Sequence, residues 1–558
     1  MYHFLRYHRK GIVAMATAIV IMSVGGGGPL SCAVPSKTEE KAFRVAMGSV
    51  DITPAANVAL DGYNGFAAYP DDYETDLQAR ILLIDNGEDT LVFINFEVLF
   101  TYMSMTSPDF KKRIADICGT DESNVFLTCN HSHHAPVASL SFTDELKIRA
   151  AVEEAYGRLR PAVMGVDMAP SPYTVSRGTT LFVDLEMTTD NLMTVVRFDD
   201  AETGQPIGMV WNLPFHGTMA NGAGAVTGNV SIRRDKLHCE LSGLACRYME
   251  DRMRETNEHF VSMFIVGFTG NTGPYVPEPG GEWRCFAASF EDQVYAGECL
   301  GGDVLAFYDA IKAEDTAGDI MKAVNIATLP RSEEPQKASV WSTNLLISLY
   351  GFGDVLCIGI NYEVFSVIGA RLRAEVPYRY TMPAGGVGGS GGYLPTKEAF
   401  SLPMYYENSA QATCFDSNVE EAFYEKVMEL VCSIAGVAPA RIEGIAAPVS
   451  TEGIAAVYTF DYGQLVTPDK VVISFGQKSR NDCGSDFELT LYDDAGKVVY
   501  TQTFEGYSSS YIGITLDDVT FASSTLTVTR KWQSGGFVTE GIYALNPEVY
   551  GIVFAPVE

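Results

Sequence analysis

Three of the chain's eight histidines stand within four consecutive positions, at His131, His133 and His134. The preceding stretch "NVFLT" (124–128) is apolar and β-branched, which predicts that the cluster follows the end of a buried strand. Residues two apart in an extended chain share a face, so His131 and His133 can point the same way while His134 points away. This pattern suits a metal site, a catalytic acid–base pair, or polar residues that merely end a strand.

Three other residues with metal-binding side chains lie at the ends of apolar runs or turns. His216 follows "WNLPF" and precedes small residues that let a ligand approach the backbone. Glu363 stands where a buried strand turns into a helix, and burying a carboxylate is costly unless it is paired or bound to a metal, although a helix N-terminus lowers that cost. Tyr393 closes the glycine-rich tract 383–393, which we expect to be a mobile loop because it lacks the lysine of a phosphate loop.

Two histidines, a carboxylate and one further oxygen ligand at separate strand ends would suit a catalytic zinc ion. Such an ion takes three nitrogen or oxygen ligands at roughly 2.0–2.2 Å and keeps a place for water. The residues are scattered along the chain, so spacing alone also allows each to be a satisfied polar residue at a strand end.

The elements that must position these residues alternate between strand-like and helix-like patterns from about residue 42. The stretch 79–100 turns at "DNGED" like a hairpin, and a predicted helix over 144–161 is stopped by Pro161. Interleaving of this kind predicts an α/β (α+β) core with helices layered over sheet. The prediction also depends on the strands 43–54, 124–128 and 353–360 and the helices 109–119, 363–377 and 419–436.

The pattern changes near residue 440, after which little helical periodicity remains. The stretch "ELTLYDDAGKVVYTQT" (488–503) alternates on both sides of a glycine-containing turn, which indicates a hairpin. We therefore predict one domain over residues 44–440 and a small all-β sandwich domain over residues 445–558.

The N-terminus has the pattern of an export signal. Arg6, Arg9 and Lys10 precede the apolar run 11–24, which is too short for a comfortable membrane span and typical of a signal sequence. We expect residues 1–31 to be a signal peptide.

The approach "PLSC" to Cys32 resembles a bacterial lipobox, in which the cysteine is acylated and begins the mature chain. This predicts lipidation at Cys32, a polar tether over residues 32–43, and an exported lipoprotein held at the outer membrane or cell surface of a bacterium. Simple secretion is the alternative.

The net charge and the cysteine spacing argue against a nucleic-acid partner and against a cysteine-based zinc site. The chain has 70 acidic and 39 basic residues and a formal net charge of −31, so we expect no nucleic-acid partner, which would need a basic surface. The ten cysteines beyond Cys32 form no C-x-x-C pair, which argues against a cysteine-based zinc site. Pairing of Cys285 with Cys299 in an exported protein stays open.

Several of these stretches resemble, in order along residues 44–430, the neutral and alkaline ceramidases, which are zinc amidases that hydrolyse the N-acyl bond of ceramide. "NHSHHAP" (130–136) is similar to the family's H-T-H-S-G-P and is the most specific match. "FHGTMANG" is similar to the segment with the second histidine ligand, and "NYEVFSVIGARLR" to the pattern P-G-E-F-T-x-x-x-G-x-R-L-R. "GGYLPTKEAFSLPMYYENSA" is similar to G-Y-x-T-x-E-E-Y…Y-E-x-x-S, and the stretches beginning "GSVDITP" and "LQARILL" to the family's opening strands.

The resemblance implies a zinc-hydrolase-like catalytic domain over residues 44–440. It makes His131, His216, Glu363 and Tyr393 the ligands of a Zn²⁺ ion.

His133 then becomes a catalytic residue beside His131, holding the metal's water or polarising a carbonyl. For His134 we expect a side chain that faces away or shapes the pocket. For Glu97, in "NFEVLF", we expect a surface-facing carboxylate.

The chain also departs from the family. In "NTGPYVP" (271–277), Val276 stands where ceramidases have their active-site serine and Pro274 replaces an aspartate, while Asn229 stands at another aspartate position. The resemblance thus implies that the zinc ligands are retained, whereas some residues around the substrate differ from those of the family. We predict that Asn271, Tyr275 and Val276 bind the substrate. Without that serine, the resemblance leaves metal-activated water as the nucleophile.

Three functions remain open at this point. The first is zinc-dependent hydrolysis of an N-acyl amide, either ceramide-like or another N-acylated substrate. The second is a zinc enzyme of the same fold acting on an ester or on an extracellular glycan substituent or linkage. The third is a non-catalytic binding lipoprotein. The partner is accordingly a small-molecule, lipid or glycan substrate, with the membrane contacted through the lipid anchor.

Overall fold

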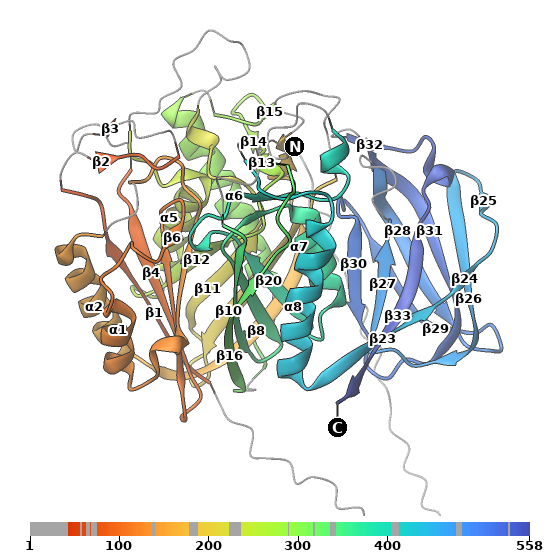
Figure 1. Ribbon diagram of the computed structural model, residues 1–558, viewed down its shortest axis with the longest axis horizontal. Helices are drawn as coiled ribbons and strands as arrows, with labels where there is room; N and C mark the ends of the chain where they lie inside the picture. Colours follow the sequence, from red (N-terminus) through yellow and green to blue (C-terminus); the bar gives the residue numbers. More distant parts are fainter. Residues whose placement is uncertain are drawn as a thin grey trace, which may run out of the picture. The chain divides into compact units, whose positions relative to one another are not determined.

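Figure 1 shows the strands and helices that the chain forms between residues 43 and 557. Cys32, Asn229 and the predicted signal peptide lie outside the described residues. The computed structural model describes residues 43–55, 58–62, 67–68, 75–136, 140–177, 188–221, 236–287, 289–315, 318–334, 342–402, 412–475, 482–533 and 536–557.

An eight-stranded sheet forms the centre of the N-terminal part. Within it β11–β12 and β5–β7 are parallel and the other described pairings are antiparallel. Ile81 and Leu83 of β4 belong to the core on one face and Leu82 and Ile84 to the core on the other, because side chains alternate along a strand. In spatial order the strands are β12 (Val261–Val266), β11 (Pro206–Leu213), β10 (Leu192–Asp200), β8 (Arg160–Pro170), β1 (Arg44–Asp51), β4 (Gln78–Asp85), β5 (Thr90–Phe96) and β7 (Val125–Cys129).

A four-stranded sheet packs against one face of this large sheet. The ring of Phe93 in β5 meets Tyr350 and Phe352 edge to face, with ring centroids 6.0 and 5.8 Å away. The strands of the smaller sheet, in order, are β16 (Ile320–Thr328), β17 (Asn344–Phe352), β18 (Val355–Ile360) and β20 (Tyr380–Ala384).

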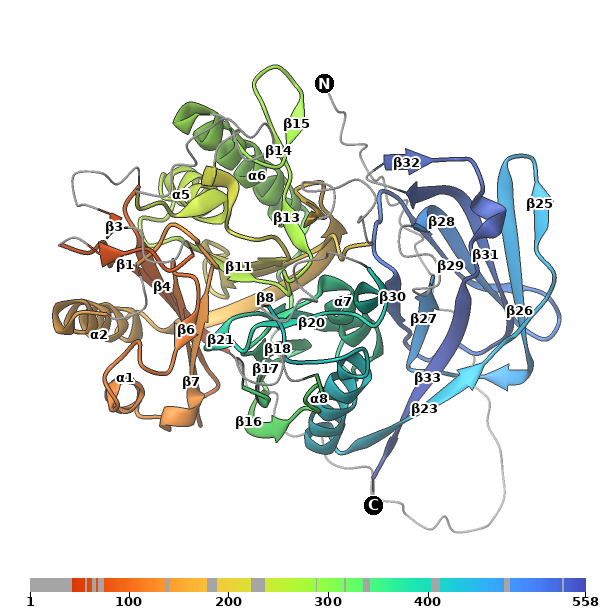
Figure 2. The same cartoon turned by 45° about the horizontal axis from the view of Figure 1, so that its top comes forward.

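Helices cover the outer faces of both sheets (Figure 2). Those that contact the eight-stranded sheet are α1 (Phe110–Cys118), α2 (Phe142–Tyr156), α5 (Glu240–Met253) and α6 (Phe290–Ala310). Those on the four-stranded sheet are α7 (Ser366–Glu375) and α8 (Val419–Ala435). Ser141 and Ser289 begin α2 and α6 with reciprocal capping boxes, which satisfy backbone N–H groups that a helix start leaves open.

Short strand pairs join the loops at the ends of these sheets. They are β9 (Thr174–Ser176) with β13 (Thr272–Pro274), β14 (Val276–Pro277) with β15 (Trp283–Arg284), β19 (Glu363–Val364) with β22 (Tyr393–Leu394), β6 (Thr101–Tyr102) with β21 (Val387–Gly388), and β2 (Val58–Ala59) with β3 (Ala67–Ala68).

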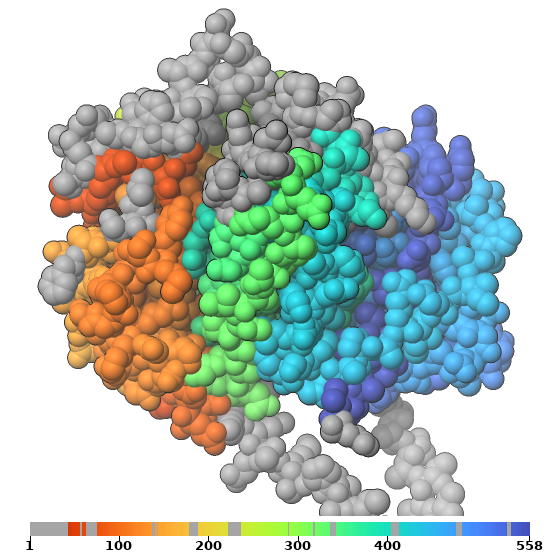
Figure 3. Space-filling view, in the orientation of Figure 1, coloured from red at the N-terminus to blue at the C-terminus, as the bar shows by residue number. Residues whose placement is uncertain are grey.

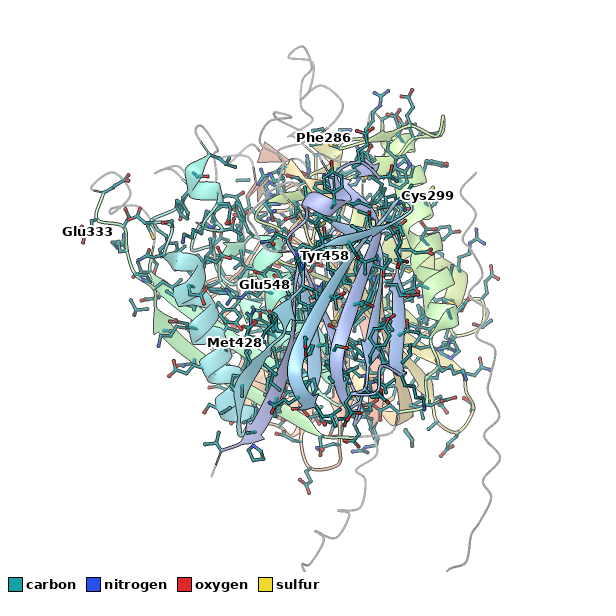
Figure 4. The ribbon with its side chains drawn as sticks, turned by 90° about the vertical axis from the view of Figure 1, so that its right-hand side faces the viewer. Phe286, Cys299, Glu333, Met428, Tyr458 and Glu548 are labelled. Carbon is teal, nitrogen blue, oxygen red and sulfur yellow. The ribbon has the colours of Figure 1, made fainter. Side chains whose placement is uncertain are left out.

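Beyond α8 the described chain forms two facing antiparallel sheets with a shared apolar core. Tyr458, labelled in Figure 4, donates from its hydroxyl to the carbonyl oxygens of Ile542 and Leu545, at 2.5 and 3.1 Å. The first sheet contains β23 (Val437–Glu443), β33 (Glu548–Pro556), β27 (Lys470–Ser474) and β30 (Tyr511–Thr515). The second contains β24 (Ile445–Ala446), β25 (Ser450–Glu452), β26 (Ala455–Val466), β31 (Phe521–Gln533), β32 (Gly536–Val538), β28 (Asp482–Tyr492) and β29 (Val498–Phe504). The division into domains 44–440 and 445–558 stays a prediction.

The predicted α/β (α+β) layered fold class is wrong, because the structure is mostly β, with 43% of the described residues in strands against 22% in helices. The helices expected near α1, α2, α7 and α8 do form. Strands without a clear periodic signal in the sequence account for the higher strand content. β8 pairs with β10 and β10 pairs with β11, both antiparallel, and β16 pairs with β17 in the same way. Antiparallel neighbours need no helical crossover, so strands accumulate without helices between them.

The expectation that the Glu97 carboxylate faces the surface is also wrong. Only 1% of its surface is exposed, and it accepts hydrogen bonds from Arg80 at 2.6 Å and Arg247 at 3.0 and 3.1 Å. Burial raises the pKa of Glu97, but the two guanidinium groups outweigh burial and lower it below its usual value. Arginine pairing lets the end of β5 bury a carboxylate.

None of the ten described cysteines, from Cys118 to Cys483, forms a disulfide, so Cys285 and Cys299 are not bonded to each other in this structure. Among the described residues, no helix has both the length and the apolar character that crossing a membrane requires.

Candidate metal centre

Two histidines follow the ends of two strands that are not neighbours in the large sheet, and the backbone fixes one ring nitrogen of each. His131 follows β7, and its Nδ1 lies 3.1 Å from the carbonyl oxygen of Leu99. His216 follows β11, and its Nδ1 lies 2.9 Å from the carbonyl oxygen of Thr272. A carbonyl only accepts, so each Nδ1 carries the proton and donates, and each Nε2 presents a lone pair.

Close backbone contact brings the two histidine segments together. His133 donates its backbone N–H to the carbonyl oxygen of Gly217 at 3.0 Å, and Ser132 and Gly217 form a parallel bridge. A Cβ at Gly217 would lie 2.3 Å from the carbonyl oxygen of His131, so only glycine fits there. The small residue after His216 is therefore a requirement of the site's backbone.

The histidine rings and a carboxylate converge. One nitrogen from each of His131, His133 and His216 lies within 4.8 Å of the others. Oε2 of Glu363 is 3.0 Å from His216 Nε2 and 3.6 Å from His131 Nε2. These four residues come from three separate strand ends.

The short β19–β22 pair places Tyr393 directly beside Glu363. The two residues are partners in the parallel register, and Glu363 donates its backbone N–H to the carbonyl oxygen of Gly392 at 3.0 Å. The Tyr393 hydroxyl lies 3.5 Å from His216 Nε2. The glycine-rich tract thus ends in a strand that returns Tyr393 to the histidines.

Burial sets the charge of the cluster. Burial, followed by the charge of Arg177, lowers the pKa of His216 to about 3, and burial with the neighbouring histidines lowers the pKa of His133 well below its usual value. Burial raises the pKa of Glu363, but the close contacts with His131 and His216 outweigh burial and hold that pKa well below its usual range. Near neutral pH the imidazoles of His133 and His216 are therefore neutral, and the Glu363 carboxylate is ionised.

These contacts fit a bound divalent cation. With Nδ1 protonated, the lone pair of neutral His216 Nε2 faces the Glu363 carboxylate at 3.0 Å, which is repulsive without a cation between them. His131 Nε2 is buried and has no hydrogen-bond partner among the described residues. Ligand atoms about 2.0–2.2 Å from a tetrahedral zinc are roughly 3.4 Å apart, close to the observed 3.0 and 3.6 Å. Nitrogen and oxygen donors of this kind suit zinc.

The three predicted substrate-binding residues make hydrogen bonds or packing contacts within the protein. Asn271 is fully buried, and its Oδ1 accepts from the backbone N–H and hydroxyl of Ser366 at 2.7 and 2.9 Å, which ties its loop to the start of α7. Val276 is buried in the core in β14. Tyr275 is half-buried, with its ring 5.4 Å from that of Trp283. Their part in substrate binding stays a prediction.

His134 turns away from the other histidines, into a separate buried contact. Its Nδ1 lies 2.6 Å from Oε1 of Glu240, whose Oε2 accepts from the backbone N–H of Ala220 at 3.2 Å. Glu240 thus links the segment of His131 to the segment of His216. Sequence reasoning missed it, because nothing in the neighbourhood of residue 240 marks a carboxylate of this kind.

Arg177 is a second residue that sequence reasoning missed. Its Nη1 donates to the Tyr393 hydroxyl at 2.8 Å and lies 3.3 Å from His216 Nε2. It follows β9 in the ordinary stretch "TVSRG", so only the pairing of β9 with β13 reveals that it reaches the site.

No protein-family profile matches the chain, and no curated protein matches it. Among solved structures the chain is similar to the neutral ceramidase from Pseudomonas aeruginosa and to a ceramidase complexed with C2. Each is 15% identical to this chain with a TM-score of 0.56, and each match covers 93% of this chain and 100% of the other. At this identity the likeness shows the fold alone, so the chain has a ceramidase-like fold.

Proposed function

We propose that the protein is a zinc-dependent hydrolase that cleaves the amide bond of an N-acylated substrate with water. The convergence of His131, His216 and Glu363 carries the proposal, because two imidazoles and an ionised carboxylate meet where the buried Nε2 of His131 has no hydrogen-bond partner among the described residues. The ceramidase-like fold supports the choice of an amide as the bond.

His131, His216 and Glu363 would hold the zinc ion, with Tyr393 beside them. When bound, zinc lowers the pKa of a coordinated water to about 7 and polarises a carbonyl group. Loss of the family's serine at Val276 leaves water as the attacking group, because a valine side chain has no nucleophilic atom.

His133 and Arg177 supply the remaining chemistry. The ring of His133 lies 5.2 Å from His131 and 5.5 Å from His216, and its neutral imidazole accepts a proton from water or passes one to the leaving amine. Arg177, a fixed cation 3.3 Å from His216 Nε2, stabilises the negative charge that develops on the carbonyl oxygen.

The proposal also covers where the protein is located. The basic start, short apolar run and "PLSC" stretch support export and lipidation at Cys32, which places the enzyme at the surface of a bacterial outer membrane. A Cys32→Ser variant should then appear in the soluble fraction, and unchanged membrane association of that variant would refute lipidation.

The proposed reaction is tested with the purified mature chain and N-octanoyl amides. Hydrolysis, followed by release of the free amine, should disappear after dialysis against a chelator and return when zinc is added back. Amide hydrolysis that persists in protein shown to be metal-free would contradict a zinc mechanism.

A further inference from the structure

A short loop after β2 runs directly alongside the histidine cluster. Leu60 forms an antiparallel bridge with Pro136, and Asp61 donates its backbone N–H to the carbonyl oxygen of Ala135 at 3.0 Å. A Cβ at Gly62 would lie only 2.5 Å from the Cβ of His133. The loop therefore lines the same part of the molecule as the proposed catalytic histidine.

Asp61 points a carboxylate toward this cluster. The Tyr102 hydroxyl makes a hydrogen bond with the carboxylate, and His131 lies near enough to lower the pKa of Asp61. The carboxylates of Asp61 and Glu363 both act on the Tyr102 hydroxyl, and both raise its pKa after burial. The Tyr102 hydroxyl is thus near both Asp61 and the carboxylate of the candidate metal centre.

Aromatic packing fixes Tyr102 in this position. Its ring lies 5.5 Å from that of Phe100, which lies 5.2 Å from that of His131. Its backbone pairs with Gly388 in the glycine-rich tract that leads to Tyr393. The hydroxyl is therefore held by the same elements that hold the metal ligands.

One carboxylate oxygen of Asp61, Oδ2, is buried and lacks a hydrogen-bond partner among the described residues. Burial raises the pKa of Asp61 in spite of the Tyr102 hydrogen bond. Buried polar atoms are nearly always paired, so this oxygen indicates that a ligand supplies the missing partner.

We propose that Asp61, positioned by Tyr102, binds a hydrogen-bond donor on the amine side of the substrate, close to the scissile amide. The inference rests on the proposed amide hydrolysis and names its substrate class: N-acylated amines that carry a hydroxyl or ammonium group. Both groups donate to a carboxylate oxygen, and an amine with only an alkyl group in that position would leave Oδ2 unpaired.

Three N-octanoyl amides test this assignment, those of 2-aminoethanol, 1,2-diaminoethane and propylamine, which place a hydroxyl, an ammonium or a methyl group at one position. Their dissociation constants are measured by calorimetry with the metal-free full chain, in which the proposed turnover does not interfere. We expect the hydroxyl or ammonium amide to bind about 10- to 100-fold more tightly than the methyl amide, the usual cost of leaving a buried acceptor unpaired.

Variants identify the residue and the donor. Asp61→Leu should bind all three amides equally, while Asp61→Asn, which keeps an acceptor but no charge, should keep a preference for hydroxyl and lose one for ammonium. Tyr102→Phe should weaken the preference, and Asp51→Asn, at an exposed aspartate ending β1, should leave it intact. Thermal unfolding of each variant confirms that it is folded.

The outcomes separate the two proposals. Equal or unmeasurable binding of all three amides to the wild type, or a preference that survives Asp61→Leu, would overturn the role of Asp61. A preference that depends on Asp61, in a zinc-loaded protein that hydrolyses none of the amides, would instead refute the proposed reaction and leave the binding residue in place.

Discussion

At the scale of single residues, the candidate centre depends on which nitrogen each histidine turns outward. Backbone carbonyls of Leu99 and Thr272 hold Nδ1 of His131 and His216, so both Nε2 atoms face Glu363. Partners of this kind fix the tautomer and orientation of metal-binding histidines. The strand end that carries each histidine therefore also prepares it for a metal.

His133 provides a prediction at this scale. It lies beside both histidines, and the proposal gives it proton transfer and no share in holding the metal. His133→Ala should lower kcat by about 10²–10⁴, the usual contribution of a general acid or base. Zinc stoichiometry, measured by atomic emission, should stay near that of the wild type. Loss of the metal together with activity would mean that His133 is a ligand, whereas full activity would remove it from the chemistry.

At the scale of elements, α7 is tied to the site at its start. Glu363 lies three residues before this helix, and Ser366, its first residue, donates twice to Asn271. Farther along, Arg373 of α7 pairs with buried Asp190 at 2.5 Å. The helix thus links the carboxylate of the candidate centre to two loops of the eight-stranded sheet.

Asn271 therefore has a predicted structural effect. Asn271→Ala leaves the buried N–H and hydroxyl of Ser366 without their acceptor, which should lower the free energy of unfolding by about 1–3 kcal/mol. Ser366→Ala should cost less, because the backbone hydrogen bond to Asn271 remains. Urea unfolding measures both. An Asn271→Ala variant with wild-type stability and a raised KM would show that Asn271 acts on the substrate instead.

The sequence could predict those site residues that stand at the ends of strands. An apolar run followed by a histidine or carboxylate is a local signal, and it located His131, His216 and Glu363. Asp61 and Arg177 carry no such signal, because each reaches the site through pairing with residues distant in sequence, such as Ala135 and Asn271. The mostly β fold was missed for the same reason, since antiparallel pairing depends on partners and not on local periodicity.

At the scale of the whole molecule, the C-terminal sheets pack directly on α7. A Cβ at Gly513 in β30 would lie 2.5 Å from Cα of Ala374, and the Tyr550 hydroxyl donates to Glu375. The space-filling view in Figure 3 shows β16 (green) and α8 (cyan) between the N-terminal residues (orange) and the C-terminal sheets (blue). The C-terminal sheets therefore support the helix that begins beside the candidate centre.

Lys470 makes this contact sensitive to pH. It is 3% exposed, its Nζ donates to the carbonyl oxygen of Tyr378 at 2.6 Å, and burial lowers its pKa from 10.5 to about 7. Between pH 7 and 10.5 the unfolded chain binds this proton more firmly than the folded chain, so the free energy of unfolding rises with pH. This lysine contributes at most about 1.4 kcal/mol per pH unit in that window.

Urea unfolding at several pH values between 7 and 10 measures the effect. Lys470→Met should flatten the rise in the free energy of unfolding, whereas Lys497→Met, at an exposed lysine in the turn before β29, should leave the rise unchanged. Equal slopes for the wild type and Lys470→Met would show that Lys470 keeps an ordinary pKa in the folded protein.

Metal analysis tests the central claim most directly. Mature protein reconstituted with zinc and then desalted should contain one zinc per chain, and anomalous diffraction at the zinc edge should place it between His131, His216 and Glu363. His131→Ala and Glu363→Ala should lose most of this zinc, while His259→Ala, at an exposed histidine, should keep it. A reconstituted wild type without zinc, or a zinc ion bound at another place, would contradict the account.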